Sequence, residues 1–280
     1  MDGTEVVRWP NGRSLAICQW GVPDGVPVFF LHGTLGGRLL RHAAGEYERH
    51  NLRVITYDRP GFGRSTRHQG RVVADGAADV ALIADQLGVG RFGVVGVSGG
   101  GPYALAVAAL LPERVTRCAT IVTGAPLDAE GLDFFADMDP QRREDWQRII
   151  AGGEAYLLED YQHTLAWLDE FEVQGAADSS TEDHDLVVAA FRDALAAGPY
   201  GLVDDCLAEL QPYGFNLCDV VAPTRMMLAR DATSVPANYG RWLLVHLPNA
   251  ELEWVEGGHF GPRDEQEEQL FAWAGQESET

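Results

Sequence analysis

The sequence predicts an α/β fold in which a mostly parallel, eight-stranded sheet is flanked by helices and carries an inserted helical segment. Short apolar runs alternate with segments of helical periodicity along most of the 280 residues. The chain opens with two strand-like runs around a turn, and about a hundred residues, 123–223, separate the sixth run from the seventh. A parallel sheet with an antiparallel start and one long insertion accounts for this pattern.

The first two strands are expected to form a hairpin. They are Glu5 to Trp9 and Ser14 to Trp20, and Asn11-Gly12 lies between them. Asn-Gly favours this turn because both residues tolerate the positive φ angles of a tight hairpin. The chain therefore starts in antiparallel pairing.

Six further runs are short and almost wholly apolar, which is typical of strands buried on both faces of a parallel sheet. They are Val28 to Leu31, Val54 to Tyr57, Phe92 to Val97, Cys118 to Val122, Thr224 to Leu228 and Leu252 to Val255. Helices are expected at Arg38 to His50, Val72 to Leu87 and Gly100 to Leu111, the last of which ends before Pro112. These helices join the parallel strands as crossover connections.

The long segment between the sixth and seventh strands is expected to be a helical lid. It is too long for a crossover, and its acidic, amphipathic stretches include Pro140 to Ile150 and Asp183 to Ala197. We therefore expect a core formed by residues 1–126 and 220–280, with residues 127–219 as the lid.

Charge and composition exclude several function classes. The formal net charge is −21, so the electrostatic field repels nucleic acids and anionic membranes and favours a neutral, small-molecule substrate. All 21 basic residues are arginine, which excludes Schiff-base chemistry on lysine. The N-terminus lacks a basic segment followed by an apolar one, and we expect a cytoplasmic protein. No clustered ligands suggest a metal ion or another cofactor, and the oligomeric state is not predicted.

The strongest chemical signal is the segment Gly96-Val97-Ser98-Gly99-Gly100, which lies between an expected strand and an expected helix. A serine on such a tight turn is a nucleophile elbow, because the glycines relieve clashes and the helix N-terminus offers N–H groups to a developing oxyanion. A dinucleotide-binding glycine turn would instead follow the first strand and have an acidic residue about 20 positions later.

Together with two other segments, this elbow resembles the α/β-hydrolase superfamily. The segments are His32-Gly33-Thr34-Leu35-Gly36-Gly37 and Asp58-Arg59-Pro60-Gly61-Phe62-Gly63-Arg64-Ser65. The resemblance implies that the backbone N–H groups of Thr34 and Gly99 hold the oxyanion. It gives His32 a structural role, and the second segment marks the fold without taking a catalytic step.

The same resemblance places the catalytic base at His259, in Glu256-Gly257-Gly258-His259 after the last strand. A histidine pKa near 6.5 suits a group that accepts the serine proton and returns it to the leaving group. The acid in the chain order Ser, acid, His is expected at Asp231, although Ala232 occupies its place in the family pattern. Asp128, after the preceding strand, is the alternative acid.

These residues predict a serine hydrolase that cleaves a small, apolar or neutral carboxylic ester or lactone through an acyl-enzyme on Ser98. Phe134 and Phe135, near the start of the lid, are the aromatic residues favoured to contact the substrate. The same serine chemistry could serve carbon–carbon bond hydrolysis, amide hydrolysis or perhydrolysis. A non-catalytic ligand-binding protein is the rival from another class: the displaced Asp231 favours it, whereas the intact Ser98 and His259 argue against it.

Overall fold

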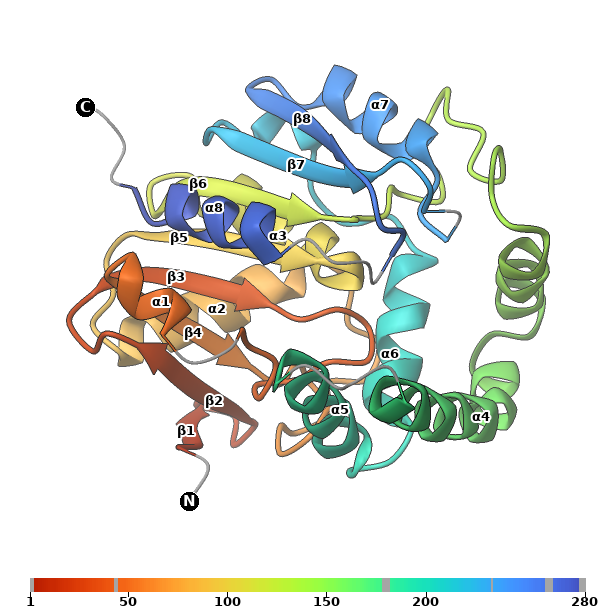
Figure 1. The fold of residues 1–280 in the computed structure, drawn as a ribbon, viewed down its shortest axis with the longest axis horizontal. Helices are drawn as coiled ribbons and strands as arrows, with labels where there is room; N and C mark the ends of the chain where they lie inside the picture. Colours follow the sequence, from red (N-terminus) through yellow and green to blue (C-terminus); the bar gives the residue numbers. More distant parts are fainter. Residues whose placement is uncertain (1–2, 43–44, 178–181, 233, 260–263, 277–280) are drawn as a thin grey trace.

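The computed structural model describes the chain except for residues 1–2, 43–44, 178–181, 233, 260–263 and 277–280 (Figure 1). Its centre is an eight-stranded sheet with the order β1-β2-β4-β3-β5-β6-β7-β8. The strands are β1 (Glu5–Arg8), β2 (Ser14–Gly21), β3 (Val26–Leu31), β4 (Leu52–Tyr57), β5 (Phe92–Val97), β6 (Val115–Ile121), β7 (Thr224–Ala229) and β8 (Ala250–Val255). The predicted fold class is confirmed, and the expected strands are found at these places with small changes at their ends.

The register of the sheet brings two functional loops together. β1 pairs with β2 and β2 with β4 in antiparallel fashion, whereas all other neighbours are parallel. In the parallel pair β3 and β5, Leu31 lies opposite Gly96. The loop after β3 and the turn after β5 therefore begin side by side at the carboxyl ends of these strands. Parallel α/β sheets bind their ligands at this end of the strands.

Helices cover both faces of the sheet and make two cores. The flanking helices are α1 (Glu46–Arg49), α2 (Asp75–Gln86), α3 (Gly101–Leu110), α7 (Ala237–His246) and α8 (Asp264–Ala274). Side chains alternate along β3, so Phe29 packs in the core that contains α2 and α3, whereas Phe30 packs against Phe271 of α8. This burial on both faces explains why the strands read as continuous apolar runs.

The expected helix at 38–50 is wrong for most of its length, because among its described residues only α1, Glu46–Arg49, is helical. The side chain of Arg38 is fully buried and donates from Nη1 to Asp58 (2.8 Å) and to Asp193 (2.5 Å). The backbone N–H of Arg38 also donates to Asp58, at 2.7 Å. These tertiary bonds hold the chain in a turn where local propensity favours a helix.

The α-helices described between β6 and β7 are α4 (Pro140–Ala177), α5 (Glu182–Leu195) and α6 (Tyr200–Glu209). Figure 1 shows them beyond the carboxyl ends of β3, β4 and β5. α4 is broken at Gly153, whose φ of 53° and ψ of −136° are not helical. Within the described residues no single helix is long and apolar enough to span a bilayer; α5 and α6 together meet that criterion as a pair bent by 94°.

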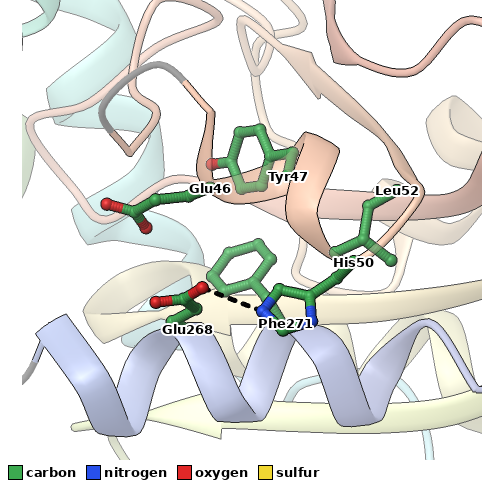
Figure 2. A pocket seen from close by; sticks show the side chains of 6 residues that line it. All are labelled: Glu46, Tyr47, His50, Leu52, Glu268 and Phe271. Atoms are coloured by element: carbon green, nitrogen blue, oxygen red, sulfur yellow. Dashed lines mark hydrogen bonds and ion pairs between the residues drawn. The ribbon is translucent and has the colours of Figure 1, made fainter.

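A shallow depression on the surface between α1 and α8 lies away from the functional edge of the sheet. Figure 2 shows Tyr47 and Phe271 filling it, while Glu268 bonds to Nε2 of His50 at 2.8 Å. Leu52, the first residue of β4, also lines the depression. The depression therefore lies near the amino ends of the parallel strands. Ion pairing and packing account for these residues.

Candidate active site

Ser98 lies on a strained backbone turn between β5 and α3. Its φ of 52° falls in the left-handed region, which costs a residue with a side chain roughly 1–3 kcal/mol and persists only where the surroundings enforce it. The surroundings here are close backbone contacts: a Cβ on Gly96 would lie 2.4 Å from the oxygen of Gly100, and one on Gly100 would lie 2.1 Å from the oxygen of Leu31. The elbow therefore requires glycine at both positions.

His259 reaches Ser98 from β8, a strand that is not adjacent to β5. β8 is separated from β5 by two strands, and the turn after β8 crosses this distance. Gly257 and Gly258 bend that turn through positive φ angles of 104° and 66°. The hydroxyl oxygen of Ser98 and Nε2 of His259 are 3.1 Å apart, within reach for direct proton transfer.

Asp231 lies against the same histidine loop. It follows β7 in a turn, and its Oδ1 accepts a hydrogen bond of 2.9 Å from the backbone N–H of Gly258, the neighbour of His259. Asp128 instead lines a cavity of about 360 Å³ together with Tyr213. This placement favours Asp231 over Asp128 as the acid. The sequence alone had left both residues as candidates, because Asp231 lies one position away from the acid of the family pattern.

The two expected oxyanion donors lie next to Ser98. A Cβ on Gly33 would be 3.3 Å from Cβ of Ser98, so the loop after β3 is in contact with the elbow. A Cβ on Gly99 would be 3.3 Å from the backbone nitrogen of Thr34. The N–H groups of Thr34 and Gly99 therefore belong to adjoining loops, as two donors that share one oxyanion must.

His32 is buried and bonded on both sides of its ring. Its Nδ1 lies 2.7 Å from the oxygen of Gly33, and its Nε2 accepts the backbone N–H of Arg59 at 3.2 Å. Burial, followed by the positive charge of Arg59, holds the pKa of His32 well below its ordinary value. The ring is therefore neutral, with its proton on Nδ1, and its bonds fix the loop after β3.

Asp205 of α6 is a buried charged residue that the sequence motifs do not mark. This carboxylate is 1% exposed and pairs with Arg59 (2.5 Å) and Arg71 (2.5 Å). The hydroxyl of Tyr103 also donates to it, at 3.0 Å. Burial would raise the pKa of Asp205, but the charges of the two arginines lower it to about 2. Asp205 is one of several acidic residues in the insertion, and nothing in the neighbouring sequence marks it as the partner of two buried arginines.

Glu209, the last residue of α6, was also missed. Its Oε1 would lie 3.0 Å from a Cβ on Gly99, which places a half-buried carboxyl beside the expected oxyanion site. Burial, followed by the negative charge of Asp205, raises the pKa of Glu209 to about 7. A carboxyl that titrates near neutrality next to a nucleophile is typical of a functional site.

The two aromatic residues at the start of the insertion form a packed cluster. Phe134 is 7% exposed, and its ring lies 5.2 Å from that of Trp146 and 5.0 Å from that of Tyr239. Phe135 packs edge-on against Phe134 and is partly exposed. Contact of either residue with a substrate stays a prediction. Across the described part of the chain, no group of three or more His, Cys, Asp or Glu side chains could hold a metal ion.

Comparison with known proteins identifies the family. The model of the α/β hydrolase fold family matches residues 26–169. A proline iminopeptidase of Neisseria gonorrhoeae is 30% identical over 268 residues, covering 85% of this chain and 84% of that protein. A 2-hydroxy-6-oxononadienedioate/2-hydroxy-6-oxononatrienedioate hydrolase of Burkholderia vietnamiensis is 28% identical over 71% of this chain and 67% of that protein. The structure of a thermophilic esterase from Thermogutta terrifontis superposes with a TM-score of 0.68 at 20% identity, covering 96% of both chains. The chain therefore belongs to the α/β-hydrolase fold family and is a hydrolase.

Proposed function

We propose that this protein is a serine hydrolase that cleaves a small, neutral or apolar carboxylic ester or lactone. The observation that carries the proposal is the contact of 3.1 Å between the hydroxyl of Ser98, on its strained turn, and Nε2 of His259. A strained elbow that presents a serine to a histidine is the arrangement needed for nucleophilic acyl transfer.

The reaction proceeds in two halves. The Ser98 oxygen adds to the ester carbonyl while its proton passes to Nε2 of His259, and the N–H groups of Thr34 and Gly99 stabilise the oxyanion. The carbon–oxygen bond to the alcohol then breaks, and His259 returns the proton to that alcohol. Water repeats the addition on the acyl-enzyme and releases the acid. Asp231 accepts the backbone N–H next to His259, which fixes the histidine loop, and its negative charge favours the protonated form of His259.

The helices α4, α5 and α6 act in this proposal as a lid. They lie beyond the edge of the sheet that carries Ser98, and α6 supplies Glu209 next to Gly99 (Figure 1). We therefore keep residues 127–219 as the lid and residues 1–126 and 220–280 as the core, with a small molecule as the partner bound between them.

A fluorophosphonate probe tests the nucleophile directly. We expect one covalent adduct, located on Ser98 by mass spectrometry, and none in Ser98→Ala. Hydrolysis of 4-nitrophenyl acetate and butyrate should disappear in the same variant. An unlabelled Ser98 in the folded protein would refute the serine mechanism and favour a ligand-binding protein.

A second candidate function is hydrolysis of an amide next to a positively charged amine. Glu209 supports it, because a carboxylate beside the oxyanion site attracts a cation and repels a dianion such as the dioate named for one group of relatives. The proline iminopeptidase relatives point to a peptide bond beside a proline imino group.

This candidate is tested with proline 4-nitroanilide and its N-acetylated form, whose nitrogen is neutral. We expect kcat/KM to be at least about tenfold higher for the unblocked compound, corresponding to a charge contact of about 1.4 kcal/mol. Glu209→Gln should remove that preference without removing Ser98 labelling. Equal rates for the two compounds would eliminate this candidate and leave the ester.

A further inference from the structure

We propose that Arg59, held in place by Asp205 of α6, is a positioning residue that orients and polarises the peptide unit between Gly33 and Thr34. This inference rests on the proposed function, because the N–H of that peptide unit belongs to Thr34, the expected oxyanion donor. No role in the reaction follows for Arg59 from the sequence motif in which it lies.

The carbonyl of Gly33 determines the direction of the Thr34 N–H, because both belong to one planar peptide unit. A trans peptide is planar, and its C=O and N–H point in opposite directions. Fixing the direction of the Gly33 carbonyl therefore fixes the direction of the Thr34 N–H. Nη2 of Arg59 donates to this carbonyl oxygen at 3.1 Å, and Nδ1 of His32 donates to it at 2.7 Å.

The same guanidinium holds the preceding peptide unit. Nη1 of Arg59 donates to the carbonyl oxygen of His32, and the backbone N–H of Arg59 donates to the ring of His32 at 3.2 Å. Arg59 thus bonds two successive carbonyls of the loop after β3, here called the oxyanion loop, and the ring of the histidine that fixes this loop. A rotation of the Gly33–Thr34 peptide would break bonds to both side chains.

Asp205 determines where the guanidinium lies. Nε of Arg59 donates to Oδ1 at 3.2 Å and to Oδ2 at 3.0 Å, and Nη2 donates to Oδ2 at 2.5 Å. Both side chains are 1% exposed, so solvent screens this pairing little. The planar fork of arginine allows Nη2 to bond Asp205 and Gly33 at once.

The charge of Arg59 strengthens the donor as well as aiming it. A cationic donor on a carbonyl oxygen polarises the peptide, and cooperative strengthening of the next hydrogen bond is about 10–30%. The buried group of Arg59, Arg71 and Asp205 contains two positive charges and one negative charge. Its net positive charge lies behind the loop and favours an oxyanion in front of it.

The test compares Arg59→Gln with Arg38→Gln. Arg38 is an equally buried arginine that pairs with Asp58 and with Asp193 of α5, so its substitution removes a similar buried ion pair. We expect Arg59→Gln to lower kcat for 4-nitrophenyl acetate about 10- to 100-fold with KM changed less than threefold, below the loss of roughly 10²–10³ for a whole oxyanion donor. Arg38→Gln should lower the melting temperature comparably and change kcat less than threefold.

A transition-state readout separates positioning from folding. Affinity for an alkylboronic acid, which forms a tetrahedral adduct on serine, should fall in Arg59→Gln by the same factor as kcat, whereas affinity for the product acid should stay within threefold. If Arg59→Gln does not fold, Asp205→Asn serves instead, because it keeps the arginine but loosens it. We expect about a 3- to 10-fold fall in kcat there with the same boronic-acid pattern.

The outcomes also separate this inference from the proposed function. A wild-type protein that neither labels at Ser98 nor hydrolyses esters refutes the function itself. A wild-type enzyme that does both, with Arg59→Gln or Asp205→Asn retaining kcat within threefold, overturns the role of Arg59 alone. Equal loss of kcat in Arg59→Gln and Arg38→Gln, without a change in boronic-acid affinity, would reduce the pair to a structural ion pair.

Discussion

Glu209 makes the stability of this protein depend on pH in a way that one substitution can remove. Burial, followed by the charge of Asp205, raises the pKa of its carboxyl from the ordinary 4.5 to about 7, while Arg142, Arg59 and Arg71 act in the opposite direction. The folded state therefore binds a proton that the unfolded state has already released between these two pH values. Stability from this group is present at low pH and is lost as pH rises through about 7.

The magnitude follows from the two pKa values. A difference between 4.5 and about 7 corresponds to about 3.4 kcal/mol when the carboxyl is fully ionised, and about 2.5 kcal/mol of this develops between pH 5 and pH 8. Because the side chain is half-buried, solvent screening lowers the expected effect to about 1–2.5 kcal/mol. Glu209→Gln should gain this stability relative to wild type as pH rises.

Urea unfolding of both proteins at pH 5 and pH 8 measures this difference. We expect the free energy of unfolding of Glu209→Gln minus that of wild type to be about 1–2.5 kcal/mol larger at pH 8 than at pH 5. Glu113→Gln, which changes an exposed carboxylate, serves as the control and should show no such trend. A pH-independent difference for Glu209→Gln would refute the reasoning that burial shifts this carboxyl.

Three further predictions concern the reaction centre. Asp231→Asn should lower ester kcat at least about a hundredfold, and Asp128→Asn less than threefold, in steady-state assays; equal or reversed losses would transfer the role of the acid. Ser98→Gly should raise the free energy of unfolding by about 1 kcal/mol in urea while abolishing turnover, because glycine accepts the φ of 52°; a loss of stability would contradict the strain. Gly100→Ala should lower stability by about 1–3 kcal/mol and slow probe labelling, because its Cβ would press on the oxygen of Leu31; wild-type thermal melting and labelling would contradict this.

The elbow was predictable because its requirements are local. Gly96 and Gly100 are needed at contacts within the turn or with the adjacent strand, and Ser98 lies between them. The strands were equally visible, since burial on both faces leaves an apolar run in the sequence. The family pattern pointed to the position next to Asp231, which Ala232 occupies. The turn after β7 accommodates this shift of one residue and still places Asp231 against the histidine loop.

The parts that could not be predicted depend on contacts between distant segments. Asp205 and Glu209 lie in α6, more than a hundred residues from the loops that they contact, and nothing in their neighbours marks them. The expected helix from Arg38 failed for the same reason, because its buried bonds to Asp58 and Asp193 outweigh local helix propensity. Long-range charge pairing leaves no periodic pattern in a sequence.

The ion pairs made by the helical insertion differ in their exposure to dissolved electrolyte. The Arg59–Asp205 pair, which joins α6 to the core, is buried to within 1% of its side-chain surface, where counterions do not reach it, whereas Arg192 with Asp169 and Glu172 lies open to solvent. Concentrated salt therefore weakens contacts within the helical insertion before it affects the seam between α6 and the sheet. We therefore expect ionic strength to have little effect on the contact between α6 and the loop after β3.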